Sequence, residues 1–297
     1  MTISLIWGSS FLLIKLALDA FTPLQVATGR ILTGTAAVAV MAWATGARPP
    51  RERRVWAHLM VSAFFLCTLP FLLFPLGEER ISSALAGIGN ATTPLAAVVF
   101  TGLMIPADRL SARKLVAVGV GFLGVVVIMS PWQTQGRPDL LGFSMTVVAG
   151  ASYGLGWTYV KRFLSSSDLG GLSLPAAQLS VASVQVSLAL VLTWLVAPGG
   201  RGAPWSPAVP AGHSLRPALL ALLMLGVVGT GVAYNLQFDL VRAVGPQIAT
   251  TITYLIPIVA VLLGIAFLDE RLTSWQLAGA GIVLVAAVVI GLPGRRR

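Results

Sequence analysis

Charged residues are scarce in this chain. Lys, Arg, Asp and Glu together make up only 10% of its 297 residues, whereas a typical soluble domain has about 25%. Hydrophobic residues reach 56%. Because so few charged side chains cannot cover a water-exposed surface, lipid is predicted to surround most of the molecule.

Cysteine and histidine are almost absent. The single cysteine, Cys67, excludes an internal disulfide, and two histidines, His58 and His213, argue against a structural zinc site. Cys67 is therefore expected to be a small buried apolar residue. We expect no metal and no cofactor.

The sequence also lacks signatures of enzymes. It has no GxxxxGK[ST] loop, so the chain itself is not predicted to hydrolyse ATP, and no ATPase subunit is implied. No nucleophile with an adjacent base is visible, which makes a membrane-embedded enzyme the weaker alternative.

The net charge is +10, but the cations lie in short turns without an aromatic binding motif, which argues against nucleic acid as a partner. Their sidedness instead predicts topology, since cytoplasmic loops are enriched in Lys and Arg. Thirteen fall on one face: Arg48, Arg51, Arg53, Arg54, Arg109, Arg113, Lys114, Lys161, Arg162, Arg242 and Arg295 to Arg297. Five fall on the other: Arg80, Arg137, Arg201, Arg216 and Arg271. Both termini are therefore predicted to be cytoplasmic.

Ten apolar windows have the length that a bilayer requires of a helix. They are residues 3–18, 24–45, 55–76, 81–105, 115–131, 140–160, 174–197, 216–238, 246–268 and 274–292. The first window has no basic leader and no small-residue cleavage site, so it is interpreted as a retained helix and not a signal peptide. The fold class predicted is an all-α, polytopic membrane protein with ten transmembrane helices.

A hairpin pattern occurs twice. Residues 94–111 begin Pro-Leu-Ala and end Asp-Arg-Leu-Ser, and residues 257–273 begin Pro-Ile-Val and end Glu-Arg-Leu-Thr. A glycine follows ten residues after each arginine, at Gly119 and Gly281. Five spans per copy make the second copy enter the membrane from the opposite side, as in the inverted repeats of secondary transporters. The predicted repeats are residues 1–133 and 139–293.

Three motifs carry a family resemblance. They are Trp7-Gly8-Ser9-Ser10-Phe11, the segment from Ile81-Ser82-Ser83-Ala84 to Pro94, and Glu270-Arg271-Leu272. With these three motifs in this order, the chain resembles the EamA branch of the drug/metabolite transporter superfamily. The resemblance implies a multi-pass carrier of the bacterial inner membrane, in most cases an exporter of amino acids, metabolites or drugs. In the first repeat, Asp108 stands before the arginine where members of the family usually have glutamate. This turn is interpreted as structural.

Two cations fall inside spans, where charge is costly and marks functional candidates. Lys15 lies about 18 Å along the first helix from Ile3, and Arg30 reaches a similar depth in the second. Both can face an outward cavity and attract a carboxylate or phosphate. Alternatively, they reach the outer headgroups or pair with Asp19. If Lys15 binds substrate, Lys15→Met should weaken transport of an anionic or zwitterionic solute.

Acidic residues are absent from the middle of every span. All ten Asp and Glu residues lie in turns or at span ends, so the first helix lacks the carboxylate on which a small multidrug resistance antiporter depends. Cationic drugs are therefore poor substrate candidates. Proton coupling through Asp19 or Asp239 stays open, although both are better explained as helix-end residues.

Uncharged polar residues recur at helical spacing and are predicted to line a substrate cavity. With Lys15, the predicted substrate-binding residues are Trp7, Ser10, Asn90, Thr93, Tyr153, Trp157, Tyr234, Gln237, Gln247, Thr250 and Tyr254. The alternative is that such residues only bond neighbouring helices together. Pro94 and Pro257 each remove a backbone hydrogen bond and are predicted to act as hinges or to leave a carbonyl free for substrate.

The function predicted is secondary transport of a small organic metabolite such as an amino acid, by alternating access between the two repeats. A lipid flippase or a channel-like module is the alternative. The partners expected are the lipid bilayer and a small-molecule substrate, with the protein a monomer or a homodimer.

Overall fold

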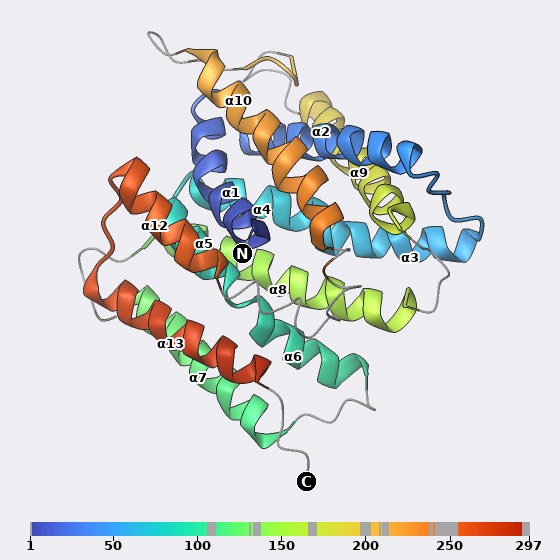
Figure 1. Ribbon diagram of the computed structural model, residues 1–297. Coiled ribbons are helices and arrows are strands. Elements are labelled where there is room, and N and C mark those ends of the chain that lie inside the picture. Colours follow the sequence, from blue (N-terminus) through green and yellow to red (C-terminus); the bar gives the residue numbers. More distant parts are fainter. Residues whose placement is uncertain are drawn as a thin grey trace.

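The computed structural model describes residues 2–105, 111–130, 132, 138–165, 171–196, 203–207, 209, 214–237, 240 and 255–292. Across these ranges the regular structure is helical and contains no strand, which confirms the predicted all-α class. Figure 1 shows the helices packed side by side. In chain order they are α1 (Thr2–Leu18), α2 (Pro23–Ala44), α3 (Arg53–Ala63), η1 (Phe64–Thr68), α4 (Leu69–Glu78), α5 (Ser83–Asn90), α6 (Thr93–Met104), α7 (Ala112–Met129), α8 (Leu140–Phe163), α9 (Ser173–Val196), α10 (Leu215–Gly226), η2 (Val227–Val232), α12 (Ile256–Leu268) and α13 (Ser274–Gly291).

Eight helical stretches of the described chain are long and apolar enough to cross a bilayer, when α3–η1–α4, α5–α6 and α10–η2 through Gln237 are each counted as one stretch. Helices α1 and α12 are shorter apolar helices. All ten predicted windows overlap one of these helices. The first part of the ninth window, through residue 254, lies outside the described residues. The chain is thus a multi-pass membrane protein, and the count of ten spans stays a prediction.

Three spans are interrupted, whereas the sequence predicts them as continuous. The third span is α3, the π-helical segment η1 and α4, and the eighth is α10 followed by the π-helical segment η2. The fourth breaks at Ala91 and Thr92 between α5 and α6. Pro94 and Pro257 lie in the first turns of α6 and α12, where a missing N–H costs no helical bond.

The helix pairings follow the internal repeat. Helix α1 packs on α12 and α10, while α8, five spans later, packs on α6 and α4. Helices α2 and α9, which are counterparts, pack on each other, as do α7 and α13. Exchanging each span for its counterpart therefore exchanges these pairs. The inverted orientation of the repeats, and their boundaries, stay predictions.

Helices α7 and α13 lie side by side along one edge of the molecule (Figure 1). Glycines bring them together: a Cβ added at Gly279 would lie 2.6 Å from Ile128 Cγ1 and 2.7 Å from the Gly124 carbonyl oxygen. A Cβ added at Gly119 or Gly281 would have no neighbouring atom within 4 Å. The two glycines that repeat in the sequence are therefore not the ones that allow this approach.

The turn between α4 and α5 is held by a residue from the other half of the chain. The Glu270 carboxylate accepts hydrogen bonds from the backbone N–H groups of Ser83 at 2.7 Å and Ala84 at 2.9 Å. These are first-turn donors of α5, which lack helical partners and favour a negative charge. Glu270 thus fixes the start of the helix that ends at Asn90.

We expect Gly279→Ala to lower the thermal unfolding midpoint, because the added methyl group overlaps backbone atoms of α7 and overpacking costs about 1–3 kcal/mol. Gly281→Ala is the matched control, and its midpoint should stay unchanged or rise slightly. Both are measured in one detergent at one scan rate, since unfolding of membrane proteins is often irreversible. Equal effects of the two substitutions would contradict the packing described.

Glu270→Ala should also lower the unfolding midpoint, because it leaves two backbone donors of α5 without an acceptor, at a cost of about 1–3 kcal/mol. Glu79→Ala, at an exposed position of the same turn, should have little effect. The comparison is made by thermal unfolding of the purified variants. A Glu270→Ala protein as stable as the control would show that the carboxylate is dispensable.

Candidate functional site

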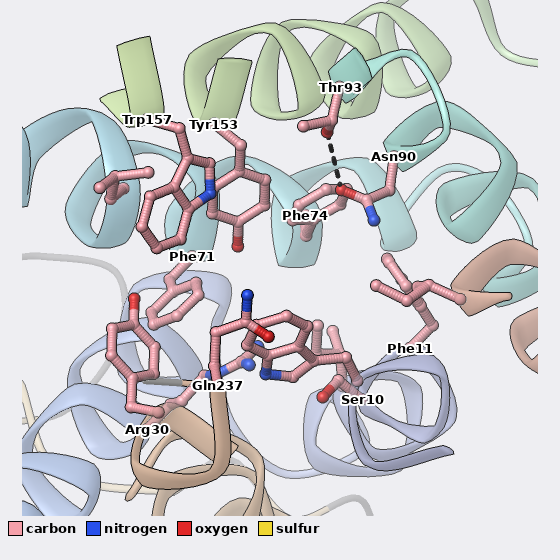
Figure 2. A pocket seen from close by; sticks show the side chains of 15 residues that line it. Ser10, Phe11, Arg30, Phe71, Phe74, Asn90, Thr93, Tyr153, Trp157 and Gln237 are labelled. Atoms are coloured by element: carbon pink, nitrogen blue, oxygen red, sulfur yellow. Dashed lines mark hydrogen bonds between the residues drawn. The ribbon is translucent and has the colours of Figure 1, made fainter. Parts of the chain in front are cut away.

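A cavity of about 90 Å³, the central cavity, lies among α1, α2, η1, α4, α5, α6, α8, α12 and the segment after η2. Its lining is Trp7, Ser10, Phe11, Ile14, Arg30, Leu66, Phe71, Phe74, Asn90, Thr93, Tyr153, Trp157, Tyr234, Gln237 and Ile256. Figure 2 shows Arg30, Gln237 and Ser10 on one side of this central cavity, and Asn90, Thr93, Tyr153 and Trp157 on the opposite side. Both repeats contribute residues to it.

Aromatic rings form much of the cavity wall. Phe74 on α4 makes an edge-to-face contact with Phe11 on α1 at 5.2 Å between ring centroids, and its ring lies 6.1 Å from that of Tyr153 on α8. Such contacts fix the rings in place. The wall therefore offers a preformed apolar surface to a ligand.

Arg30 is the charged residue of the cavity. Its side chain is only 6% exposed. Nε donates a hydrogen bond to Thr230 Oγ1 at 3.1 Å, and the guanidinium lies 4.0 Å from the centroid of the Phe71 ring. Within the described part of the chain, no carboxylate lies within 4 Å of it. A buried cation without an acidic partner is costly, and its free N–H groups can donate to an anionic ligand.

Two amides supply further polar groups. Gln237 is buried, and its Oε1 atom has no hydrogen-bond donor among the described residues. Asn90 Oδ1 accepts a bond from the Thr93 hydroxyl at 3.4 Å across the break between α5 and α6 (Figure 2). Ser10, in contrast, donates to the Ile6 carbonyl of its own helix at 3.2 Å. The clearest vacant acceptor in the cavity is therefore Gln237 Oε1.

The two π-helical segments lie next to residues that line the cavity. The Trp7 indole N–H donates to the Gly229 carbonyl in η2 at 3.1 Å, so Trp7 offers its ring and not its donor to a ligand. Cys67 in η1 lies 3.2 Å from the Tyr234 hydroxyl, just after η2. Cys67 is fully buried as predicted, but it is a hydrogen-bonding residue and not a purely apolar one.

Eight of the predicted binding residues line the central cavity: Trp7, Ser10, Asn90, Thr93, Tyr153, Trp157, Tyr234 and Gln237. Gln247, Thr250 and Tyr254 lie outside the described residues. The sequence leaves the role of Arg30 open and does not predict Phe11, Phe71 or Phe74 as residues of the cavity. The depth of Arg30 in its span is the available signal; the phenylalanines carry none, because lipid-facing positions are equally apolar.

Lys15, also predicted to bind substrate, does not line the central cavity. Its ammonium donates to the backbone carbonyls of Glu78 at 2.5 Å and Ile81 at 3.2 Å, at the end of α4. It borders a second cavity of about 470 Å³, the end cavity, which is lined by Lys15, Leu16, Asp19, Glu79, Arg80, Ile81, Ser82, Leu268 and Glu270. Lys15 thus caps carbonyls that have no helical donor, in neither of the two arrangements that the sequence suggested.

Metal chemistry has no visible basis in the part of the chain described. No group of three or more His, Cys, Asp or Glu side chains there could hold a metal ion. The arrangement in the central cavity instead suits reversible binding, with a cation, a vacant acceptor and rigid rings around one space.

Comparisons with known proteins cover nearly the whole chain. The model of the EamA-like transporter family matches residues 1–130 and 140–292. The uncharacterized inner membrane transporter YedA of Escherichia coli K12 is 24% identical over 290 residues, covering 97% of this chain and 88% of that protein. A probable amino-acid metabolite efflux pump of the same strain is 26% identical over 307 residues, covering 98% and 93%. A crystal structure with a TM-score of 0.62 and 18% identity covers 98% of this chain and 99% of its own, a likeness of fold.

Lys15→Met should lower the thermal unfolding midpoint, because the carbonyls at the end of α4 lose a charged donor, at a cost of about 1–3 kcal/mol. Binding of ligands in the central cavity should stay unchanged, since Lys15 does not line it. Thermal unfolding with and without ligand separates the two effects. A normal midpoint combined with weaker ligand binding would return Lys15 to the substrate site.

Proposed function

Because this chain belongs to the EamA-like transporter family, we propose that it is a secondary transporter, working as an exporter, of a small amphipathic metabolite that carries a carboxylate, such as an amino acid. The observation that carries this proposal is the position of Arg30 in the central cavity. This residue is buried, faces the central cavity, and has no acidic partner among the described residues.

The carboxylate of the substrate is proposed to bind Arg30. A guanidinium offers several N–H donors in one plane, which suits a carboxylate. Nε is already bonded to Thr230, and stacking on Phe71 holds the group in place. The remaining donors are those available to a ligand.

An amino group of the substrate finds its acceptor in Gln237. The vacant Oε1 atom on the same side of the cavity as Arg30 (Figure 2) suits an ammonium donor. The apolar part of the substrate then lies against Phe11, Phe74 and Tyr153. This division favours a zwitterion with an apolar side chain over a cationic drug, which Arg30 repels.

Alternating access supplies the transport step. The central cavity, at about 90 Å³, is smaller than the roughly 300–1,000 Å³ of ordinary ligand sites, so a metabolite enters only when helices separate. Inverted repeats at residues 1–133 and 139–293 would rock about this cavity, with Pro94 and Pro257 as the proposed hinges. Gln247, Thr250 and Tyr254 of the ninth span are proposed to complete the site.

The bacterial inner membrane is the proposed location, in keeping with the inner membrane transporter named above. The excess of Arg and Lys in one set of turns supports the proposal that both termini lie in the cytoplasm. On this topology the end cavity opens outward.

The alternative is a lipid flippase or a channel-like module. Neither is expected to exchange a soluble solute in a saturable manner. Counterflow of radiolabelled L-phenylalanine and L-leucine in proteoliposomes therefore distinguishes a carrier from both.

The test of the proposal begins with a thermal-shift screen of the purified protein against amino acids, nucleosides and sugar phosphates. A ligand present at 100 times its Kd adds about 2.7 kcal/mol of stability. Apolar amino acids should stabilise the wild type, and the corresponding decarboxylated amines should not.

Arg30→Met should abolish this stabilisation or weaken binding roughly 30-fold, since a buried charged contact contributes about 2 kcal/mol or more. Arg80→Met is the matched control, because Arg80 forms its ion pair with Asp139 at 3.7 Å outside the central cavity. Undiminished amino-acid binding by Arg30→Met, or equal binding of the decarboxylated amines, would refute the proposed role.

A further inference from the structure

Glu78 is the last residue of α4 and is completely buried. Both of its carboxylate oxygens are enclosed and have no hydrogen-bond partner among the described residues. The sequence correctly places this acid at a span end but gives no sign of its burial. Buried polar atoms are nearly always bonded, so an entirely unpartnered carboxylate needs an explanation.

The charged neighbours of Glu78 do not neutralise it by contact. Lys15 on α1, Arg30 on α2 and Glu270 before α13 are the charged groups that act on it through space. Lys15 gives its donors to backbone carbonyls at 2.5 and 3.2 Å, and no ion pair of Glu78 within 4 Å occurs in the described ranges. Glu270 is bonded to Ser83 and Ala84.

The other helices that pack on α4 add no cation near Glu78. Asp139, the residue before α8, pairs with Arg80 on the chain just after α4, and the Tyr153 ring of α8 stacks on Phe74. The cations of α8, Lys161 and Arg162, lie in its last turn, at the opposite end of the helix from Asp139. Helix α5 carries no ionisable side chain. A permanently ionised Glu78 would be costly in such surroundings, whereas a neutral carboxylic acid is tolerated there.

Glu78 lines neither cavity, but its neighbours on the chain line both. Phe74, one helical turn earlier on α4, lines the central cavity, and Glu79, the next residue, lines the end cavity. On α1, Ile14 lines the central cavity and the next residue, Lys15, lines the end cavity. A small movement of α1 against α4 would therefore expose the carboxyl group to one cavity or the other.

We propose that Glu78 is the proton-binding site that couples transport to the proton gradient. This inference rests on the proposed transport function. A proton taken up from one cavity joins a carboxylate oxygen to give the neutral acid, and it leaves to the other cavity after the helices move. Because Glu78 acts on Arg30 through space, its charge changes the affinity of Arg30 for the substrate carboxylate.

The first experiment needs no substrate. Infrared difference spectra of the purified protein are recorded between acidic and alkaline buffers, since a protonated carboxyl group has a carbonyl band that a carboxylate lacks. One such band should vanish in Glu78→Gln and persist in the control Glu79→Gln, which alters an exposed carboxylate one residue away. Glu78→Asp should keep a shifted band. An unchanged set of bands in Glu78→Gln would overturn the proposal.

The second experiment measures coupling in proteoliposomes, with radiolabelled L-phenylalanine as the probe. The wild type and Glu79→Gln should accumulate it when a pH gradient of one orientation is imposed. Glu78→Gln should retain at least half of the wild-type counterflow, which needs no net proton movement, and lose the gradient-driven accumulation at least ten-fold. A purely structural role would reduce both readouts together.

The outcomes separate the two proposals. Absence of counterflow in the wild type would refute the transport function proposed for amino acids, while the infrared result would still decide whether Glu78 binds a proton. Counterflow without any effect of a pH gradient in the wild type would refute coupling alone. Gradient-driven accumulation that survives in Glu78→Gln would assign the proton to another group.

Discussion

Lipid offers no hydrogen bonds, so every interruption of a membrane helix must be satisfied by the protein itself. This constraint explains the most unusual contacts in the structure. The turn between α4 and α5 likewise leaves carbonyls and N–H groups without helical partners, and they are met by Lys15 and by Glu270. Trp7 donates in the same way to a carbonyl of η2. Lys15, Glu270 and Trp7 come from parts of the chain distant in sequence from the groups they satisfy, so these helix ends and interruptions depend on the tertiary structure.

The interrupted membrane helices are among those that contribute residues to the central cavity. The α5–α6 break carries Asn90 and Thr93, and η1 and η2 carry or precede Leu66 and Tyr234. Irregular backbone inside a membrane is tolerated where it borders a cavity, and π-helical turns often mark functional sites. By contrast, α7 and α13 are uninterrupted and pack through glycines at the edge of the molecule. This arrangement suggests a rigid outer pair and a central group of helices that can change shape.

Two charged side chains are buried in the part of the chain that the structure describes. Arg30 and Glu78 are both buried, and each acts on the other through space without forming an ion pair. Such a separation leaves each group able to bind a partner of its own, a carboxylate for Arg30 and a proton for Glu78. In the proposed mechanism the two binding events are coupled, because neutralising one charge changes the electrostatic potential at the other.

The membrane fold and most of the central cavity follow from the order of residues alone. Apolar runs of the required length predict the helices, since hydrophobic length is what a bilayer selects, and polar residues at helical spacing indicate eight of the residues that line the cavity. Which cations and acids are buried, however, depends on how the helices pack. Lys15 and Arg30 look alike in sequence, yet one caps α4 and the other enters the cavity, because a different helix packs beside each. Glu78 looks like an ordinary span-end acid, and its burial arises from the packing of α1, α5 and α8 around the end of α4.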